Sequence, residues 1–217
     1  MDWTAVDRAR VDRRGPRRGR RLGDLLAPLC VVADIGLQRA GGALSEMSGT
    51  PVQAVAAQVR RVPLPLVPWL VGGPEAAVAT TYLKVRGSVD GHVVLVLRLR
   101  AARRLIAMIL GEPPGNLLHV DDVARSVLGE VGNVVGSFFL AALADSARVE
   151  IAPSPPMVIV DMCGAALDPI LAELGKQGDH VLVIDTVFRL RGQQAKALFL
   201  MLCAQRHFDL LLEKLPR

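Results

Sequence analysis

A helix that begins at Asp121, with the sequence DDVARSVLGEVGNVVGSFFLAAL, constrains the fold of this chain more than any other segment. An α-helix turns 100° per residue, so its side chains sort onto separate faces. One face carries glycines at three positions: Gly129, Gly132 and Gly136. Each glycine costs a helix interior about 1 kcal/mol relative to alanine. We therefore expect another part of the chain to pack closely against this face.

The same helix has a polar stripe about 60° wide and an apolar band roughly 120° away from it. The stripe consists of Ser126, Glu130, Asn133 and Ser137. The band predicted to face the core consists of Val127, Val131, Val134, Phe138 and Ala142. Two interpretations of the stripe are open: it is the solvated face of an amphipathic helix, or its carboxylate and carboxamide form a functional site.

The spacing of these residues favours a site. Pro156 follows Asn133 in the pattern Ser126-x3-Glu130-x2-Asn133-x22-Pro156, which resembles the signature of the CheC/CheX/FliY family of chemotaxis phosphatases. The loop and hairpin from Leu70 to Leu97 and the segment from Ile151 to Leu171 are also similar to CheC proteins. The likeness extends over roughly residues 29–215.

The resemblance implies an α+β fold with a CheC-like pseudo-two-fold duplication, in which two α/β repeats share a sheet and two long helices lie side by side. Along the chain, repeat one is expected at about residues 29–113 and repeat two at about 118–217, within one domain at 23–217. Hydrophobic alternation on both sides of Asp90-Gly91 predicts a hairpin in the first repeat.

Two local similarities support duplication. Asp34-Ile-Gly-Leu37 aligns with Glu130-Val-Gly-Asn133 at an offset of 96, and the pattern after Ala101 aligns with that after Ala204 at an offset of 103. In this alignment Asp34 and Leu37 take the places of the glutamate and asparagine that CheC proteins commonly carry in each repeat. Leucine can neither donate nor accept a hydrogen bond, so we predict a degenerate first site and one bound regulator per chain.

The resemblance also implies the function: hydrolysis of the aspartyl phosphate on a CheY-type response regulator. Asn133 would orient the attacking water and Glu130 would pair with a lysine of the regulator, while Ser126 and Pro156 would support them. The phosphatase needs no cofactor or metal of its own, because the regulator brings a divalent ion such as Mg²⁺. Two alternatives are a non-catalytic protein that binds phosphorylated CheY or CheD, and a scaffold of the flagellar switch.

Charge and composition restrict the other classes. Residues 1–22 contain eight arginines and three aspartates, whereas the rest has 18 basic and 18 acidic residues, so the net charge of +5 lies in this tail. We expect a disordered, solubilising extension rather than a nucleic-acid-binding arm. No uninterrupted apolar run reaches the roughly 18 residues of a membrane-spanning helix, so a cytoplasmic protein is predicted. The three scattered cysteines are expected to be core thiols.

Overall fold

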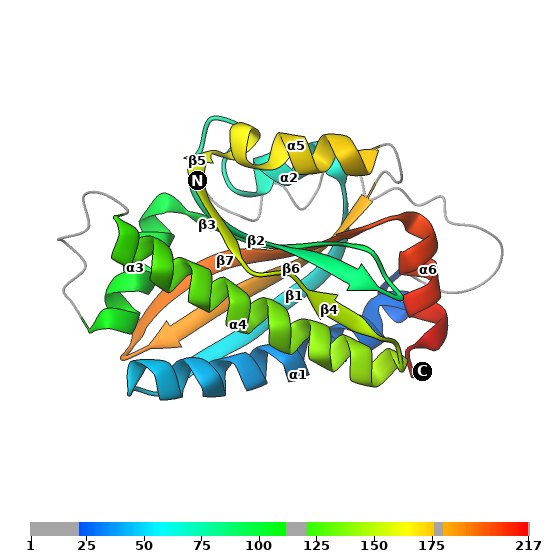
Figure 1. Cartoon of the computed structure of the whole chain (residues 1–217), viewed down its shortest axis with the longest axis horizontal. Helices are drawn as coiled ribbons and strands as arrows, with labels where there is room; N and C mark the ends of the chain where they lie inside the picture. Colours follow the sequence, from blue (N-terminus) through cyan, green and yellow to red (C-terminus); the bar gives the residue numbers. More distant parts are fainter. Residues whose placement is uncertain (1–21, 112–120, 176–179, 217) are drawn as a thin grey trace.

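The computed structural model describes residues 22–111, 121–175 and 180–216, and it confirms the predicted α+β class (Figure 1). The elements of the first repeat are α1 (Leu22–Ser48), β1 (Val52–Pro63), the 3-10 helix η2 (Leu64–Leu66), α2 (Val67–Leu70), β2 (Ala77–Gly87), β3 (Gly91–Arg98) and α3 (Leu99–Leu110). Those of the second are α4 (Asp122–Ala147), β4 (Ile151–Pro153), β5 (Met157–Met162), α5 (Cys163–Gly175), β6 (His180–Leu190), β7 (Gln193–Cys203) and α6 (Gln205–Lys214). Residues 1–21 of the predicted basic tail lie outside the described residues.

The two repeats share one antiparallel seven-stranded sheet by exchanging their edge strands. The strand order is β1-β6-β7-β3-β2-β4, with β5 also paired to β2. Thus β1 of the first repeat pairs with β6 of the second, and β4 and β5 of the second pair with β2 of the first. The repeats meet at the centre, where β3 pairs with β7. Each repeat therefore needs strands of the other to complete its half of the sheet.

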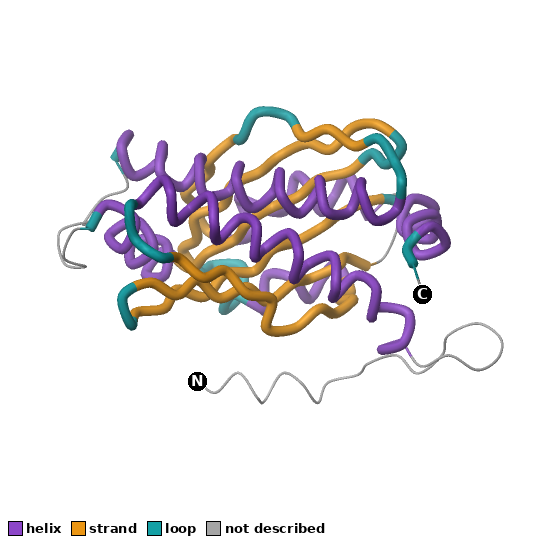
Figure 2. Tube along the Cα trace, turned by 90° about the horizontal axis from the view of Figure 1, so that it is seen from below, coloured by secondary structure: helices purple, strands orange, loops and turns teal. Residues whose placement is uncertain are grey.

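The two long helices α1 and α4 lie side by side across one face of the sheet, as predicted (Figure 2). They approach closely at Gly36, where an added Cβ would come within 2.7 Å of the Phe139 Cα atom. Gly41 allows a similar approach to β1, since its Cβ would lie 3.0 Å from the Val52 carbonyl oxygen. Both contacts require glycine because backbone atoms of a neighbouring element occupy the space of the missing side chain.

The glycine face of α4 rests on the sheet, but on side chains rather than on another backbone. A Cβ on Gly132 would lie 2.3 Å from the Cβ of Thr81 on β2, and one on Gly136 would lie 3.2 Å from Leu83. The Thr81 hydroxyl donates a 2.8 Å hydrogen bond to the Leu128 carbonyl oxygen. Thr81 is 1% exposed, so this bond is shielded from water. The glycine face thus sets how closely α4 approaches β2.

The predicted core-facing band of α4 needs a correction. Val131 and Ala142 are buried, but Val127, Val134 and Phe138 are only partly buried. The deepest positions lie on an adjacent face: Leu128, Val131, Val135, Phe139 and Leu143. The difference arises because α4 contacts both the sheet and α1, and sequence periodicity cannot separate these two contacts.

The opposite face of the sheet is covered over part of its area by η2, α2 and α5, which enclose a second apolar cluster (Figure 1). Among the described residues, α4 is the one helix long and apolar enough to span a membrane by length and hydropathy. However, 56% of its apolar stretch is buried inside the protein, where it forms part of the main core. Burial of this kind is what a core helix of a folded domain shows.

The predicted hairpin between β2 and β3 is present, but its turn differs from the expected one. The residue with a left-handed backbone is Gly87, with φ +126°, whereas Gly91 is already the first residue of β3. Gly91 is needed for a different reason, because an added Cβ would lie 2.3 Å from the Leu202 carbonyl oxygen on β7. The Asp-Gly pair therefore marks the start of a strand that lies close to its neighbour.

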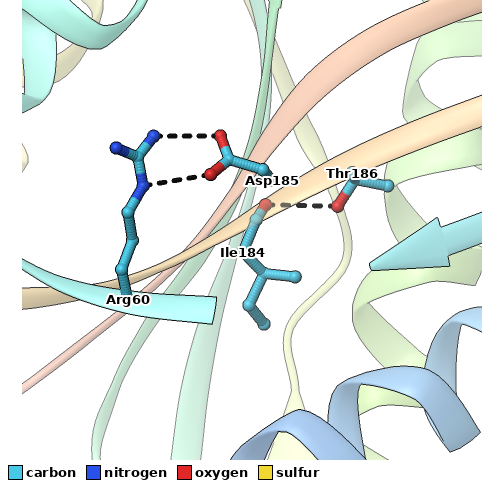
Figure 3. A network of polar contacts seen from close by, with 4 residues as sticks. All are labelled: Arg60, Ile184, Asp185 and Thr186. Carbon is cyan, nitrogen blue, oxygen red and sulfur yellow. Dashed lines mark hydrogen bonds and ion pairs between the residues drawn. The ribbon is translucent and has the colours of Figure 1, made fainter. Parts of the chain in front are cut away.

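An ion pair joins edge strand β1 to β6 across the repeat boundary (Figure 3). Arg60 Nη2 donates a 3.1 Å hydrogen bond to Asp185 Oδ1, and Arg60 Nε lies 3.0 Å from Asp185 Oδ2. The two side chains are 25% and 22% exposed. The pair between Arg39 on α1 and Asp145 on α4 is longer, at 3.4 Å, and more exposed. Only the first pair has the two-pronged, partly buried geometry that stabilises proteins measurably.

We predict that Asp185→Asn lowers the free energy of unfolding by about 1–2 kcal/mol, because it removes a charged hydrogen-bond acceptor from a partly buried arginine. The matched control Asp145→Asn should change it by less than about 0.5 kcal/mol, as expected for an exposed pair. Urea unfolding of the three proteins measures both values. Equal losses for the two variants would contradict the distinction between the pairs.

We also predict that Gly132→Ala lowers the free energy of unfolding by about 1–3 kcal/mol, because the new methyl group overlaps Thr81. Gly42 on α1 is the control: nothing lies within 4 Å of its Cβ position, so Gly42→Ala should be neutral or stabilising by up to about 1 kcal/mol. Thermal and urea unfolding provide the comparison. A Gly132→Ala protein as stable as the wild type would show that α4 is not held this closely.

Candidate functional site

The polar stripe of α4 lies on the accessible side of the helix, as the sequence predicts. Asp121 begins the helix as its N-cap, since Asp121 Oδ1 accepts a 2.8 Å hydrogen bond from the Ala124 N–H. Ser126 and Glu130 are exposed, and Asn133 and Ser137 are half-buried. The buried face of the same turns is held against β2 by the Thr81 bond. A rigid helix therefore presents the carboxylate and the carboxamide outward, one turn apart.

Ser137 is a site residue to which the sequence assigned no role. Its Oγ donates a 3.4 Å hydrogen bond to Asn133 Oδ1. This long bond biases the carboxamide toward one orientation and leaves the Asn133 N–H donors and one oxygen lone pair available to a ligand. The spacing of four residues on one helix face is the signal that could have identified this contact.

Pro156 lies in the interval between β4 and β5, where the chain leaves and rejoins the edge of β2. Ser154 anchors this interval: its N–H donates to the Lys84 carbonyl oxygen at 2.8 Å, and its Oγ accepts from the Lys84 N–H at 2.9 Å. Two residues after Pro156, Val158 approaches to 3.4 Å of the Cβ position of Gly129. The proline segment is thereby brought alongside the helix that carries Glu130 and Asn133.

Exposed apolar side chains accompany the polar site. Val123 is 60% exposed and precedes Ser126 by three residues on α4, while Met157 directly follows Pro156 and is 56% exposed. These two side chains add apolar surface beside the outward-facing polar groups, and methionine is enriched where proteins bind one another. The sequence analysis did not single out either residue.

The described cysteines have raised pKa values and do not belong to a cluster of potential metal ligands. Among the described residues, no group of three or more His, Cys, Asp or Glu side chains is placed to hold a metal ion. Burial, with a smaller contribution from Asp168, raises the pKa of Cys163 to about 11. Burial and Asp209 raise that of Cys203 to about 12, despite the opposing effect of Arg61. These thiols are protonated at neutral pH and are therefore poor nucleophiles.

The structure corrects the alignment of the two long helices. Helix α1 ends at Ser48 and α4 ends at Ala147, 99 residues later, rather than 96. With a shift of 99, the buried positions of the two helices coincide: Leu29, Val32, Leu37, Ala40 and Leu44 correspond to Leu128, Val131, Gly136, Phe139 and Leu143. The terminal helices shift similarly, because α3 begins at Leu99 and α6 at Gln205, 106 residues apart rather than 103.

The edge strands support the same shift. Strand β1 has a bulge between Ala56 and Gln58, so that Ala57 has no partner on β6. Ninety-nine residues later, Pro156 occupies the interval that separates β4 from β5. The bulge and the interval interrupt equivalent strands at equivalent positions. The segment after the first helix is therefore as long as its counterpart, with alanine in place of proline.

These observations reassign the degenerate first site. Leu37 is 1% exposed and belongs to the core, so it cannot occupy the place of half-buried Asn133. The counterpart of Asn133 is Asp34, and the counterpart of Glu130 is Val31. Both are exposed on α1. The sequence alignment erred by three residues because both helices repeat small and apolar residues at nearly this interval.

Comparisons with known proteins match the fold and one segment of the sequence. Residues 123–160, which include Glu130, Asn133 and Pro156, match the CheC-like family. Over 117 residues the chain is 33% identical to the CheY-P phosphatase CheC of Bacillus subtilis (strain 168), a match that covers 53% of this chain and 56% of that protein. The chain thus matches little more than half the length of this curated relative.

The fold resembles solved structures over most of their length. The FliY structure from Thermotoga maritima matches with a TM-score of 0.71 and 16% identity, covering 88% of this chain and 97% of that one. A chain of the FliG–FliM complex from H. pylori matches with a TM-score of 0.66 and 11% identity, covering 88% of this chain and 98% of that one. The chain thus shares the fold of the FliY structure, and its segment around Glu130 and Asn133 matches the CheC-like family.

Proposed function

We propose that this protein accelerates hydrolysis of the aspartyl phosphate on a CheY-type response regulator. The observation that carries this proposal is the Glu130-x2-Asn133 pair, presented outward by a helix whose other face is held to the sheet at Thr81. The relative CheC is a CheY-P phosphatase, and the family match covers both residues of the pair.

Hydrolysis of an aspartyl phosphate requires few catalytic groups from the phosphatase. An aspartyl phosphate is a reactive acyl phosphate, and water must attack phosphorus in line with the bond to the aspartate oxygen. That bond then breaks, and the aspartate carboxylate and inorganic phosphate are released. Catalysis of such a transfer depends mainly on positioning and charge stabilisation. The family resemblance assigns a divalent metal ion and a lysine to the regulator itself.

Asn133 suits the remaining task, which is to hold the water. Its carboxamide can accept a hydrogen bond from water and donate one to a phosphoryl oxygen without adding negative charge. Ser137 restrains the carboxamide through its 3.4 Å bond. Glu130, one turn earlier and exposed, is available to pair with the regulator's lysine, which would set the register of the complex.

The exposed Val123 and Met157 side chains fit a protein substrate, because they supply apolar contact around the polar pair. Ser126 lies on the same accessible stripe and supports the edge of this contact, while Pro156 shapes the adjoining segment. Action on a chemotaxis regulator places the protein in the cytoplasm. CheD is a second partner that this proposal allows.

A second function, binding of the regulator without hydrolysis, is favoured by one observation: only the second repeat has the Glu/Asn pair. A switch scaffold related to FliM and FliY would share the fold. Such a scaffold has no chemical need for an outward carboxamide beside a carboxylate, so the intact pair favours the phosphatase. Phosphate release measured on a phosphorylated regulator separates the phosphatase from the two non-catalytic functions.

We predict that Asn133→Ala lowers the accelerated phosphate release by at least about 100-fold, comparable to the loss of one oxyanion-stabilising amide. Glu130→Ala should raise KM and lower kcat together, because it weakens docking and alignment. The measurement is phosphate release from a CheY-type regulator autophosphorylated with acetyl phosphate and Mg²⁺.

Asp145→Asn, on the same helix but in an exposed pair with Arg39, is the control and should retain wild-type activity. All variants should keep the wild-type circular dichroism spectrum, since the altered side chains lie outside the core. Wild-type turnover by Asn133→Ala would contradict the assignment of the site.

A further inference from the structure

The first repeat has a helix face equivalent to the proposed site, and its side chains differ at all three of the positions compared. With the shift of 99 residues, Val31, Asp34 and Gln38 on α1 correspond to Glu130, Asn133 and Ser137 on α4. Val31 is 59% exposed, and Asp34 and Gln38 are exposed as well. The backbone of the site is therefore duplicated and accessible, but the side chains of the site are not repeated on α1.

The supporting structure is duplicated too. Both helices bury equivalent positions on the same face of the sheet, and α1 packs on edge strand β1 as α4 packs beside β4 and β5. Ala57, in the place of Pro156, occupies the bulge of β1 and has no partner in the β1–β6 ladder. Proline is tolerated at such a bulge because no ladder hydrogen bond depends on its N–H.

The substitutions explain why this face would not work. Aspartate has the shape of asparagine, but an ionised carboxylate only accepts hydrogen bonds and carries a negative charge. Beside phosphoryl oxygens that charge is repulsive, and it removes the donor that a carboxamide offers. Valine at position 31 cannot pair with a lysine. One substitution repels the phosphoryl group, and the other removes the contact that would align the regulator.

From this placement, and resting on the proposed function, the structure assigns a latent second phosphatase site to α1, blocked by the Asp34 carboxylate and by the loss of a carboxylate at Val31. Val31→Glu together with Asp34→Asn converts this face into a working site. The structural equivalence of α1 and α4 places the carboxylate at position 31 and the carboxamide at position 34, rather than at Asp34 and Leu37.

The test uses a chain in which the second site has been removed by Glu130→Ala and Asn133→Ala. Into this background we introduce Val31→Glu with Asp34→Asn, both alone and together with Ala57→Pro. Phosphate release is measured with a CheY-type regulator autophosphorylated by acetyl phosphate and Mg²⁺. We expect release at least 10-fold above the background chain in one or both variants. If both variants are folded and the wild type is active, but neither variant releases phosphate faster than the background chain, the inference is overturned.

A matched control follows the sequence alignment instead. In the same background, Asp34→Glu with Leu37→Asn should give no activity and should lower the melting temperature, because Leu37 is 1% exposed in the core. If this pair gains activity and Val31→Glu with Asp34→Asn does not, the shift of 99 residues is wrong and the inference fails.

Binding stoichiometry separates this inference from the proposed function. Calorimetric titration with the beryllofluoride-activated regulator should give one regulator per wild-type chain and two per Val31→Glu/Asp34→Asn chain that retains Glu130 and Asn133. If the wild-type chain releases no phosphate, the proposed catalytic function fails and the titration alone decides the latent site. A stoichiometry that the two substitutions leave unchanged overturns it.

Discussion

The contact between the glycine face of α4 and β2 is the constraint on which the site depends. Gly132 lacks a side chain where Thr81 stands, and the Thr81 hydroxyl bonds to the Leu128 carbonyl oxygen at 2.8 Å. This contact sets both the distance of the helix from the sheet and its rotation about its own axis. With that rotation set, Glu130 and Asn133 face outward while Val131 and Val135 are buried. Packing on one face thereby positions chemistry on the other.

The two repeats differ in the residues at the contact between the long helix and the sheet. Gly136 on α4 lies against Leu83 and Val93, whereas its counterpart on α1 is the larger Leu37. In the second half of the sheet, the positions that correspond to Leu83 and Val93 are Thr186 and Ala197, both smaller and both buried. Large and small residues have exchanged sides, as close packing of a duplicated core requires. The repeats can therefore keep one backbone while their outward faces diverge.

An exposed site of this kind suits a protein whose partner supplies most of the reacting groups. Its polar pair stands on the accessible side of a helix, with the exposed Val123 on the same helix and the exposed Met157 directly after Pro156. Such a surface becomes an active site only when a partner covers it and excludes water. Under the proposed function, rigidity of the helix matters more than enclosure, because the helix would contribute the orientation of one carboxamide.

The sequence by itself determined the class of fold, the β2–β3 hairpin and the Glu130/Asn133 stripe, because helical and strand periodicities are local properties and the family pattern spans a single segment. It also indicated the duplication, but it placed the first-site counterparts at Asp34 and Leu37. Only the tertiary structure decided that Leu37 belongs to the core and that Val31 and Asp34 stand outward. A shift of three residues nearly preserves a helical pattern, so the correct register became evident only from the contacts with the sheet and from the equivalence of the β1 bulge with the β4–β5 interval.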